Sequence, residues 1–282
     1  MTATDPAAGD DSLFILTACL LTPARFPSVL GDDYPAACAA LGLEPYEEGY
    51  GLVLGQDGAG ARWTVVVDDV SLVAVAIASW DCGMAYDLSP GEDSVVAGLP
   101  GWPLAVVTQA PGVPDPHDPE PEEGDPAPLS PPAEGAWSPA HRRLGADEVA
   151  LRWNEWRERM DPADAPDPES PGSGTAPETP ESPGSPASSG PDPYDGVRAA
   201  LEELRGYLVE PPPVGRVRSS GLGGGEARTI RADGSGWSLA ARTDDMAFVL
   251  LDARPGEVFP VARGPRLPAL LEALDALAVR PS

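Results

Sequence analysis

Short apolar runs alternate with turn-forming residues over the first third of the chain. The run at residues 12–21 is mostly apolar and ends at Thr22-Pro23, which predicts a strand buried on both faces. Two β-prone runs, at residues 50–54 and 63–67, flank a glycine-rich stretch in which positive φ angles cost little. These two runs predict a β-hairpin.

The run at residues 70–80 is compatible with two structures. Its valines and isoleucine are β-branched and suit a strand, whereas Asp69 before it and Gly83 after it are typical helix boundaries. We predict a helix. The other elements expected here are a helix capped by Asp32 or Asp33 and ending at Leu43, and short strands at residues 84–88 and 104–108. Residues 12–110 are therefore predicted to form an α+β domain.

The last part of the chain has a clearer order of elements. Apolar residues recur at helical spacing behind Asp195 and again from Leu267 to Leu277, which predicts a helix at each end. Between them lie β-prone runs separated by glycine and aspartate turns, at residues 228–232, 237–242, 246–251 and 258–261. This order predicts a second small α+β domain, with both helices on one face of an antiparallel meander, at residues 194–282.

The stretch at residues 111–193 has a different composition. Pro, Asp, Glu, Ser and Gly dominate it, and aliphatic side chains are scarce. Such a segment cannot bury enough apolar area to offset the entropy of ordering. We expect a long, disordered, acidic, Pro-rich linker with extended arms at residues 111–134 and 161–193, and a disordered tail at residues 1–11.

One short amphipathic helix is predicted inside this linker, at about residues 147–160. Asp147 is a suitable N-cap, and two Glu–Arg pairs follow at i,i+4 spacing. The apolar stripe of this helix consists of Val149, Trp153, Trp156 and Met160. Because two tryptophans are costly to leave in water, we expect the stripe to be covered, either by one of the chain's own domains or by the groove of a partner protein.

The formal net charge of −27 is unevenly distributed. Residues 1–110 contain fifteen acids and two arginines (−13), residues 111–193 eighteen and five (−13), and residues 194–282 twelve and eleven (−1). This acidity argues against binding to nucleic acid or to an anionic membrane, since both need Arg or Lys to neutralise phosphates. The chain contains no lysine, which excludes Schiff-base chemistry and a P-loop lysine.

Arginines gather around the first strands of the C-terminal domain. Arg228, Arg231 and Arg242 are candidate interaction residues, although strand geometry does not require them to face the same way. A shared patch would attract the acidic arms or an acidic partner. Solvated strand residues are the alternative interpretation.

Catalytic and metal-binding patterns are scarce. Both histidines, His117 and His141, fall in the predicted linker, so neither is expected to have a fixed site. The three cysteines show no CxxC pair and no zinc spacing, and Cys82 is expected to be a small buried residue. We expect no metal and no cofactor.

The chain is expected to be cytoplasmic. The segment from Leu16 to Cys19 resembles a lipoprotein cleavage site, but acidic residues precede it and its apolar run is short. Absence of disulfide spacing fits a reduced compartment.

Taken together, these patterns predict a non-enzymatic protein–protein interaction or regulatory adaptor protein with an unknown protein partner. One alternative is an enzyme with a cryptic acidic or cysteine site in the N-terminal domain. Another is an immunity or acidic decoy protein that binds a basic partner. The oligomeric state is not encoded in the pattern.

Overall fold

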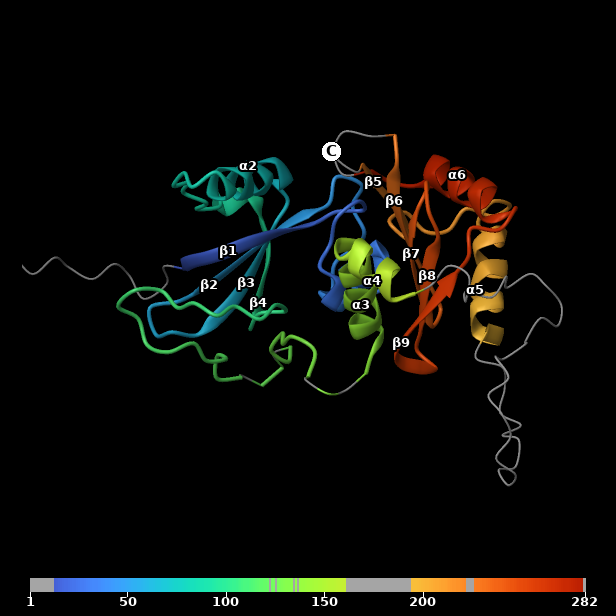
Figure 1. The fold of residues 1–282 in the computed structure, drawn as a ribbon. Helices are drawn as coiled ribbons and strands as arrows, with labels where there is room; N and C mark the ends of the chain where they lie inside the picture. The colour runs from blue at the N-terminus through green and yellow to red at the C-terminus, as the bar shows by residue number, and fades with distance from the viewer. Residues whose placement is uncertain are drawn as a thin grey trace, which may run out of the picture. The chain divides into compact units, whose positions relative to one another are not determined.

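The computed structural model describes residues 13–121, 123–124, 126–133, 135, 137–160, 194–221 and 226–280. The chain divides into two compact units, Met1–Ala136 (unit 1) and Trp137–Ser282 (unit 2), so the boundary lies inside the predicted linker (Figure 1). Both units combine helices with an antiparallel sheet, which confirms the α+β class. The predicted tail and the second arm lie outside the described residues.

Unit 1 is built on a four-stranded antiparallel sheet with the order β1-β2-β3-β4. Its strands are β1 (Phe14–Leu21), β2 (Tyr50–Gln56), β3 (Arg62–Val67) and β4 (Val95–Pro100). Helix α2 (Val70–Asp81) packs on one face around Val53 and Val67. The opposite face is covered by the 3-10 turn η1 (Ser28–Leu30) and helix α1 (Tyr34–Ala40).

Side-chain caps start both helices of unit 1. The Asp69 carboxylate accepts a hydrogen bond from the Leu72 amide at 2.9 Å, and the predicted helix at residues 70–80 is confirmed as α2. Asp33 caps α1 by accepting from the Ala36 amide at 2.8 Å. Helix α1 ends at Ala40, before the predicted end at Leu43.

Two predicted strands of unit 1 are wrong. Residues 84–88 and 104–108 form no strand, and the fourth strand is β4 instead. The segment at 84–88 serves packing rather than pairing, since Leu88 is buried under α2 and the Tyr86 carbonyl accepts from Trp80 Nε1 at 3.2 Å. Strand β4 was missed because glycine and proline interrupt its apolar pattern.

The first predicted arm is largely part of unit 1, which differs from the expectation of disorder. The His117 carbonyl accepts from the Arg62 amide at 2.8 Å, and the Leu129 amide donates to the Pro100 carbonyl at 2.7 Å. An Arg62–Asp118 ion pair adds to this attachment. The segment has few apolar side chains, but its backbone forms hydrogen bonds with backbone groups at the ends of β3 and β4. Amino-acid composition does not reveal such a role.

Unit 2 is built on a five-stranded antiparallel meander with the order β5-β6-β7-β8-β9. Its strands are β5 (Val217–Gly221), β6 (Arg228–Gly234), β7 (Trp237–Arg242), β8 (Ala247–Leu251) and β9 (Arg254–Val261). Helices α5 (Tyr194–Gly206) and α6 (Leu267–Leu277) pack on one face, as predicted. Helices α3 (Pro139–Leu151) and α4 (Trp153–Arg159) cover the other face, which the sequence did not predict (Figure 1).

The helix predicted at residues 147–160 begins earlier and has two parts. Ser138 caps α3 and Pro139 occupies its first turn, a combination that favours a helix start. The helix changes direction at Arg152, whose φ of −103° and ψ of 39° lie outside the α region. Gly145 allows α3 to approach the sheet closely, since a Cβ there would lie 3.0 Å from Leu250 Cδ2.

None of the helices that the structure describes combines the length and apolar character needed to cross a membrane.

Replacing the cap of α3 is expected to destabilise unit 2. Ser138→Ala removes the hydroxyl that accepts from the His141 amide and should lower the free energy of unfolding by about 1 kcal/mol. Urea denaturation of the full chain measures this change. Ser220→Ala, at an exposed strand position, is the matched control and should change it by less than about 0.5 kcal/mol. Equal effects of the two substitutions would contradict the assigned cap.

Candidate interaction site

The predicted tryptophan stripe lies on the sheet of unit 2. Val149 is fully buried and Trp153 is 4 % exposed, in a cluster with Phe248 and Leu250. The Trp153 ring meets Phe248 edge-on, with centroids 5.0 Å apart. Trp156 and Met160 are half-buried against the same cluster. The chain's own sheet therefore covers the stripe, which is the first of the two alternatives that the sequence left open.

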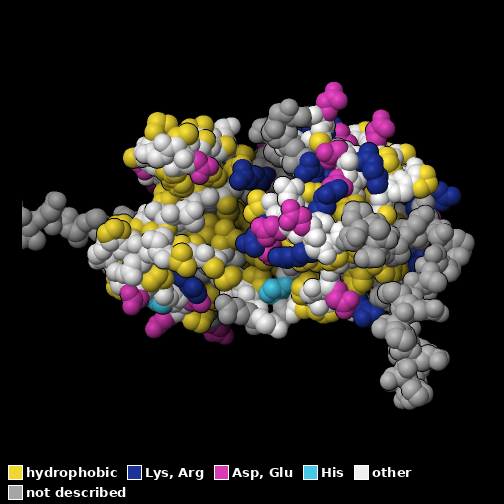
Figure 2. All heavy atoms as spheres, viewed as in Figure 1, with side chains coloured by type: hydrophobic (Ala, Val, Ile, Leu, Met, Phe, Trp, Pro, Cys, Tyr) yellow, Lys and Arg dark blue, Asp and Glu magenta, His cyan; other side chains and the backbone are white. Residues whose placement is uncertain are grey.

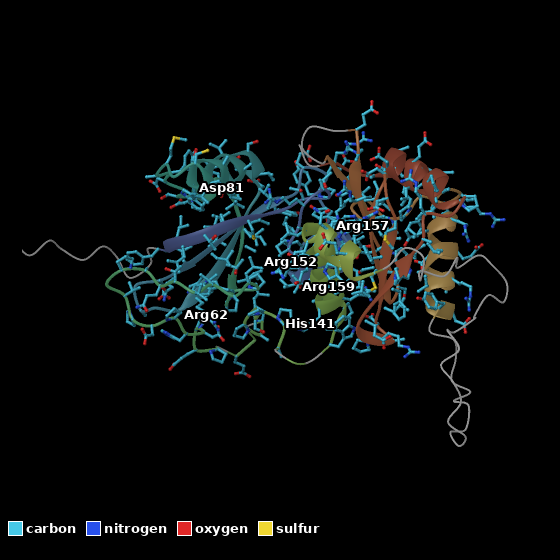
Figure 3. The ribbon with its side chains drawn as sticks, viewed as in Figure 1. Arg62, Asp81, His141, Arg152, Arg157 and Arg159 are labelled. Carbon is cyan, nitrogen blue, oxygen red and sulfur yellow. The ribbon has the colours of Figure 1, made fainter. Side chains whose placement is uncertain are left out.

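Polar contacts fix α4 above this cluster. Asp245 accepts from Trp153 Nε1 at 3.1 Å and pairs with Arg157 at 2.7 Å. The guanidinium of Arg242 lies over the Trp153 ring at 5.9 Å. Figure 3 shows Arg157 and Arg159 on α4. The half-exposed Arg157–Asp245 ion pair contributes little, so the buried tryptophan supplies most of the attachment.

The three candidate arginines of the C-terminal strands do not form one patch. Arg228 pairs with Asp275 of α6 at 2.8 Å, Arg231 pairs with Asp147 of α3 at 2.8 Å, and Arg242 pairs with Asp244 at 3.2 Å. Because α6 and α3 lie on opposite faces of the sheet, Arg228 and Arg231 point away from each other. All three neutralise carboxylates of their own unit.

The contacts of Asp275 with Arg228 and Ser219 change the pKa of its carboxyl group. Burial acts to raise the pKa of this carboxyl, but the hydrogen bond from Ser219 and the charge of Arg228 outweigh it and hold the pKa below its ordinary value. The ionised form of Asp275 is thus favoured by the folded unit.

A buried network of arginines and aspartates lies between α3 and the sheet. Its members are Arg142, Arg143, Asp147, Arg218, Arg231, Asp233, Ser238 and Asp252. Arg143 of α3 lies 3.3 Å from Asp233, which is fully buried and accepts from Ser238 at 2.6 Å. Buried charges are stable only when paired, so this network fixes the position of α3 on β5, β6 and β7.

Two arginines of the network face each other across the strands. Arg218 of β5 is the register partner of Arg231 in β6, a like-charge pairing that is unfavourable by itself. Asp147 and Asp233 compensate, lying 2.8 Å from Arg231 and 3.5 Å from Arg218 respectively. Burial and the neighbouring charge of Arg143 lower the pKa of Arg218 to about 10. The network explains why two adjacent arginines, Arg142 and Arg143, occur in α3. This helix lies in the segment whose composition predicts a disordered linker.

Neither histidine is part of a catalytic arrangement in the described residues. His141 Nδ1 lies 2.8 Å from the Ser138 hydroxyl, within one helical turn, and His117 Nδ1 lies 3.1 Å from the Asp115 carbonyl. Both therefore have fixed positions, contrary to the prediction. Figure 3 shows His141 at the start of α3, and no described carboxylate contacts it.

The cysteines differ in their exposure. Burial raises the pKa of Cys19 to about 12 despite the nearby Arg25, so its thiol stays protonated at neutral pH. Cys82 is exposed after the end of α2, which corrects the prediction of a buried residue. Among the described residues, no group of three or more His, Cys, Asp or Glu side chains could hold a metal.

The outer side of strand β1 is a candidate interaction surface that the apolar pattern does not reveal. The prediction of a strand is confirmed, but it lies at the edge of the sheet and most of its side chains are half-buried rather than buried. An apolar run does not show that a strand is at an edge, because its alternate side chains still pack under α1 and α2. Figure 2 shows hydrophobic side chains gathered on unit 1 around this strand.

The two sheet edges of unit 2 are protected by recognisable means. The outer side of β5 pairs with Val279 through Arg218, and β9 contains Pro255, Glu257 and Pro260. In unit 1, Leu129 pairs only with the end of β4, where its amide donates to the Pro100 carbonyl and it bridges Gly101. Strand β1 has neither charge nor proline, and no described segment pairs with its outer side. We call this outer side, Phe14–Leu21, the β1 edge.

Comparison of the chain with protein-family models, with curated proteins and with solved structures gives no match.

Removing the buried tryptophan tests the docking of α4 on the sheet. Trp153→Ala leaves a cavity beside Phe248 and should lower the free energy of unfolding of unit 2 by about 3–5 kcal/mol. Leu151→Ala, at a neighbouring position that is 85 % exposed, is the control and should change it by less than about 0.5 kcal/mol. Chemical denaturation followed by circular dichroism measures both. A stable Trp153→Ala variant would show that the stripe is not covered by the sheet.

Breaking the buried network should be equally costly. Asp233→Ala leaves the charges of Arg143 and Arg218 uncompensated inside unit 2, with an expected loss of about 3–5 kcal/mol. Asp244→Ala removes an exposed partner of Arg242 and is expected to cost at most about 1 kcal/mol. Thermal and urea unfolding of both variants give the comparison. If Asp233→Ala were as stable as Asp244→Ala, the network would not hold α3.

Proposed function

We propose that the chain is a non-enzymatic protein–protein interaction module of the regulatory or adaptor type, and that its unit 1 binds a basic protein partner. The observation that carries this proposal is the separation of charge between the two units. Met1–Ala136 contains 22 acids and 2 arginines, a net −20, whereas Trp137–Ser282 contains 23 acids and 16 arginines, a net −7. Most of the unbalanced charge is therefore in unit 1.

The arginines of unit 2 are largely engaged with carboxylates of the same unit. They form the buried network beneath α3 and exposed pairs such as Arg157–Asp245 and Arg205–Glu202. Unit 1 has only Arg25 and Arg62 to offset its acids, and Arg62 already pairs with Asp118. A field of this sign attracts basic proteins and repels phosphates.

The loop before β2 shows this negative potential locally. Glu44, Glu47 and Glu48 are all exposed there. The charge of Glu48, with smaller contributions from burial and from Asp68, raises the pKa of Tyr46 in the same loop. A cationic side chain placed beside this loop would relieve the repulsion, which supports a basic partner over an acidic or neutral one.

An acidic decoy protein would also bind a basic partner and would differ only in the biological effect of that binding. The proposal therefore includes it. The enzyme alternative has no comparable observation in its favour among the described residues. In the described part of the chain no histidine contacts Cys82, and the His141 ring stacks on Trp137 and contacts no carboxylate that could orient it as a catalytic base.

A salt series with matched charge variants tests the proposal. The full chain is immobilised, exposed to native lysate, and washed between about 0.1 M and 1 M salt, where the Debye length shrinks from about 10 to about 3 Å. We expect the retained proteins to be rich in Arg and Lys and to be lost steeply with salt. Glu44→Gln, Glu47→Gln and Glu48→Gln together should weaken retention several-fold.

The control is a triple variant of exposed acids in unit 2, Glu202→Gln, Glu210→Gln and Glu272→Gln. It changes the net charge by the same amount and should retain the same proteins. Retention of mainly neutral or acidic proteins, or an equal effect of the two triple variants, would contradict the assignment of binding to unit 1.

A further inference from the structure

We propose that the β1 edge receives an extended segment of another protein as a fifth strand of the unit 1 sheet, and that this segment is apolar in its centre and carries Arg or Lys at its ends. This inference rests on the proposed function, because it specifies the form in which unit 1 binds a basic partner. It is carried by three features of unit 1: the direction of backbone groups in β1, the side chains of the edge, and the acids at both ends of the strand.

The direction of the backbone groups follows from the hydrogen bonds of Arg62 in β3. Its amide donates to the His117 carbonyl and its carbonyl accepts from the Gly101 amide, both at 2.8 Å, so both groups point away from β2. Directions alternate along an antiparallel strand. The next residue, Trp63, therefore bonds to its register partner Gly55 in β2.

The same alternation continues across β2 to β1. If Gly55 bonds to β3, its neighbour Leu54 bonds to β1, where its register partner is Thr17. The following residue, Ala18, must direct its amide and carbonyl away from the sheet, and so must Leu20. No backbone hydrogen bond to either outward group is recorded from any described segment. After the register shift between Ile15 and Thr17, the β1 edge thus offers the amides and carbonyls of Ala18 and Leu20 to an incoming strand.

The side chains of the edge suit an apolar strand. Ala18 and Leu20 pack toward α2, and Leu16 and Cys19 toward the opposite cluster, each only half-buried. Phe14 is 37 % exposed. An added strand would cover these side chains on both faces of the sheet. An open edge of this length without charge or proline is an aggregation hazard unless it has an occupant.

Acidic residues lie at both ends of β1. Gly49 is in contact with the Leu21 end, since a Cβ there would lie 2.5 Å from the Leu21 carbonyl oxygen, and the exposed Glu47 and Glu48 precede it. At the other end Phe14 is the register partner of Gln56, which Asp57 follows. These positions favour a strand with basic ends.

A further acid lies on the helix that packs on the face of the sheet beside this edge. Asp81 is the exposed last residue of α2, which packs against β1 (Figure 3).

The charge of unit 1 also argues against a second copy as the occupant. Edge-to-edge pairing of two copies would bring together two units of net −20 each. Their repulsion disfavours the pair, whereas a basic segment gains from the same field.

Binding of a synthetic peptide to the full chain tests the proposal. The probe is a fluorescein-labelled peptide of eight alternating Val and Thr residues, the length of β1, with lysines at both ends. Anisotropy should show binding to the native chain. Ala18→Pro removes an outward amide and Thr17→Lys places a charge on the edge, and each should weaken binding at least about tenfold.

The matched control is Val96→Lys, which adds the same charge to the edge strand β4 on the other side of the sheet. It should bind the peptide within a factor of about two of the native chain. Circular dichroism verifies folding of each variant. If Ala18→Pro does not fold, the comparison of Thr17→Lys with Val96→Lys shows whether the peptide binds at the β1 edge.

Three outcomes would overturn the proposal. The first is equal binding by Thr17→Lys and Val96→Lys, and the second is equal affinity for a peptide with glutamates at its ends. The third is a native dimer in sedimentation that Thr17→Lys dissociates, which would make a second copy the occupant. If Thr17→Lys loses nothing while salt-dependent retention of basic proteins persists, the proposed function stands and only the β1 edge is rejected.

Discussion

The buried charge network beneath α3 is the interaction on which the organisation of unit 2 depends. Asp233 and Asp147 compensate the charges of Arg143 and Arg231 inside the unit, and those partners come from both the helix and the sheet. The network therefore fixes α3, and α3 in turn carries α4 and buries Trp153 against the sheet. The two-tryptophan helix, which resembled a free docking element, packs on the sheet of its own unit. The proposed partner is therefore placed on another surface.

Unit 1 differs from unit 2 both in charge and in the treatment of its sheet edges. In unit 2 the pairing of Val279 and the prolines of β9 protect the edges, and arginines balance most acids. In unit 1 the β1 edge has no such protection, and the surrounding acids have few counter-charges. An open apolar edge inside a negative field is a combination that a basic extended segment can satisfy. The same charge argues against nucleic acid and against a second copy as the occupant.

Local signals predicted the elements that local interactions specify. The caps Asp69 and Asp33, the hairpin of β2 and β3 and the C-terminal meander follow from capping, turns and period. The sequence pattern does not show which residues far apart in the chain pair with each other. Ser138-Pro139 starts α3 inside a segment whose composition indicated disorder, because the charges that retain it pair with strands about ninety positions away. The position of β1 at an edge was missed for the same reason, since strand order depends on partners rather than on the strand itself.

Amide hydrogen exchange of the full chain, with and without the basic-ended peptide, tests the central claim most directly. We expect that in the free chain the amides of Ala18 and Leu20 exchange fast while those of Thr17 and Cys19, which bond to β2, exchange slowly. Addition of the peptide should then slow Ala18 and Leu20 selectively. Slow exchange of Ala18 and Leu20 in the free chain, or protection by the peptide at β4 instead of β1, would contradict it.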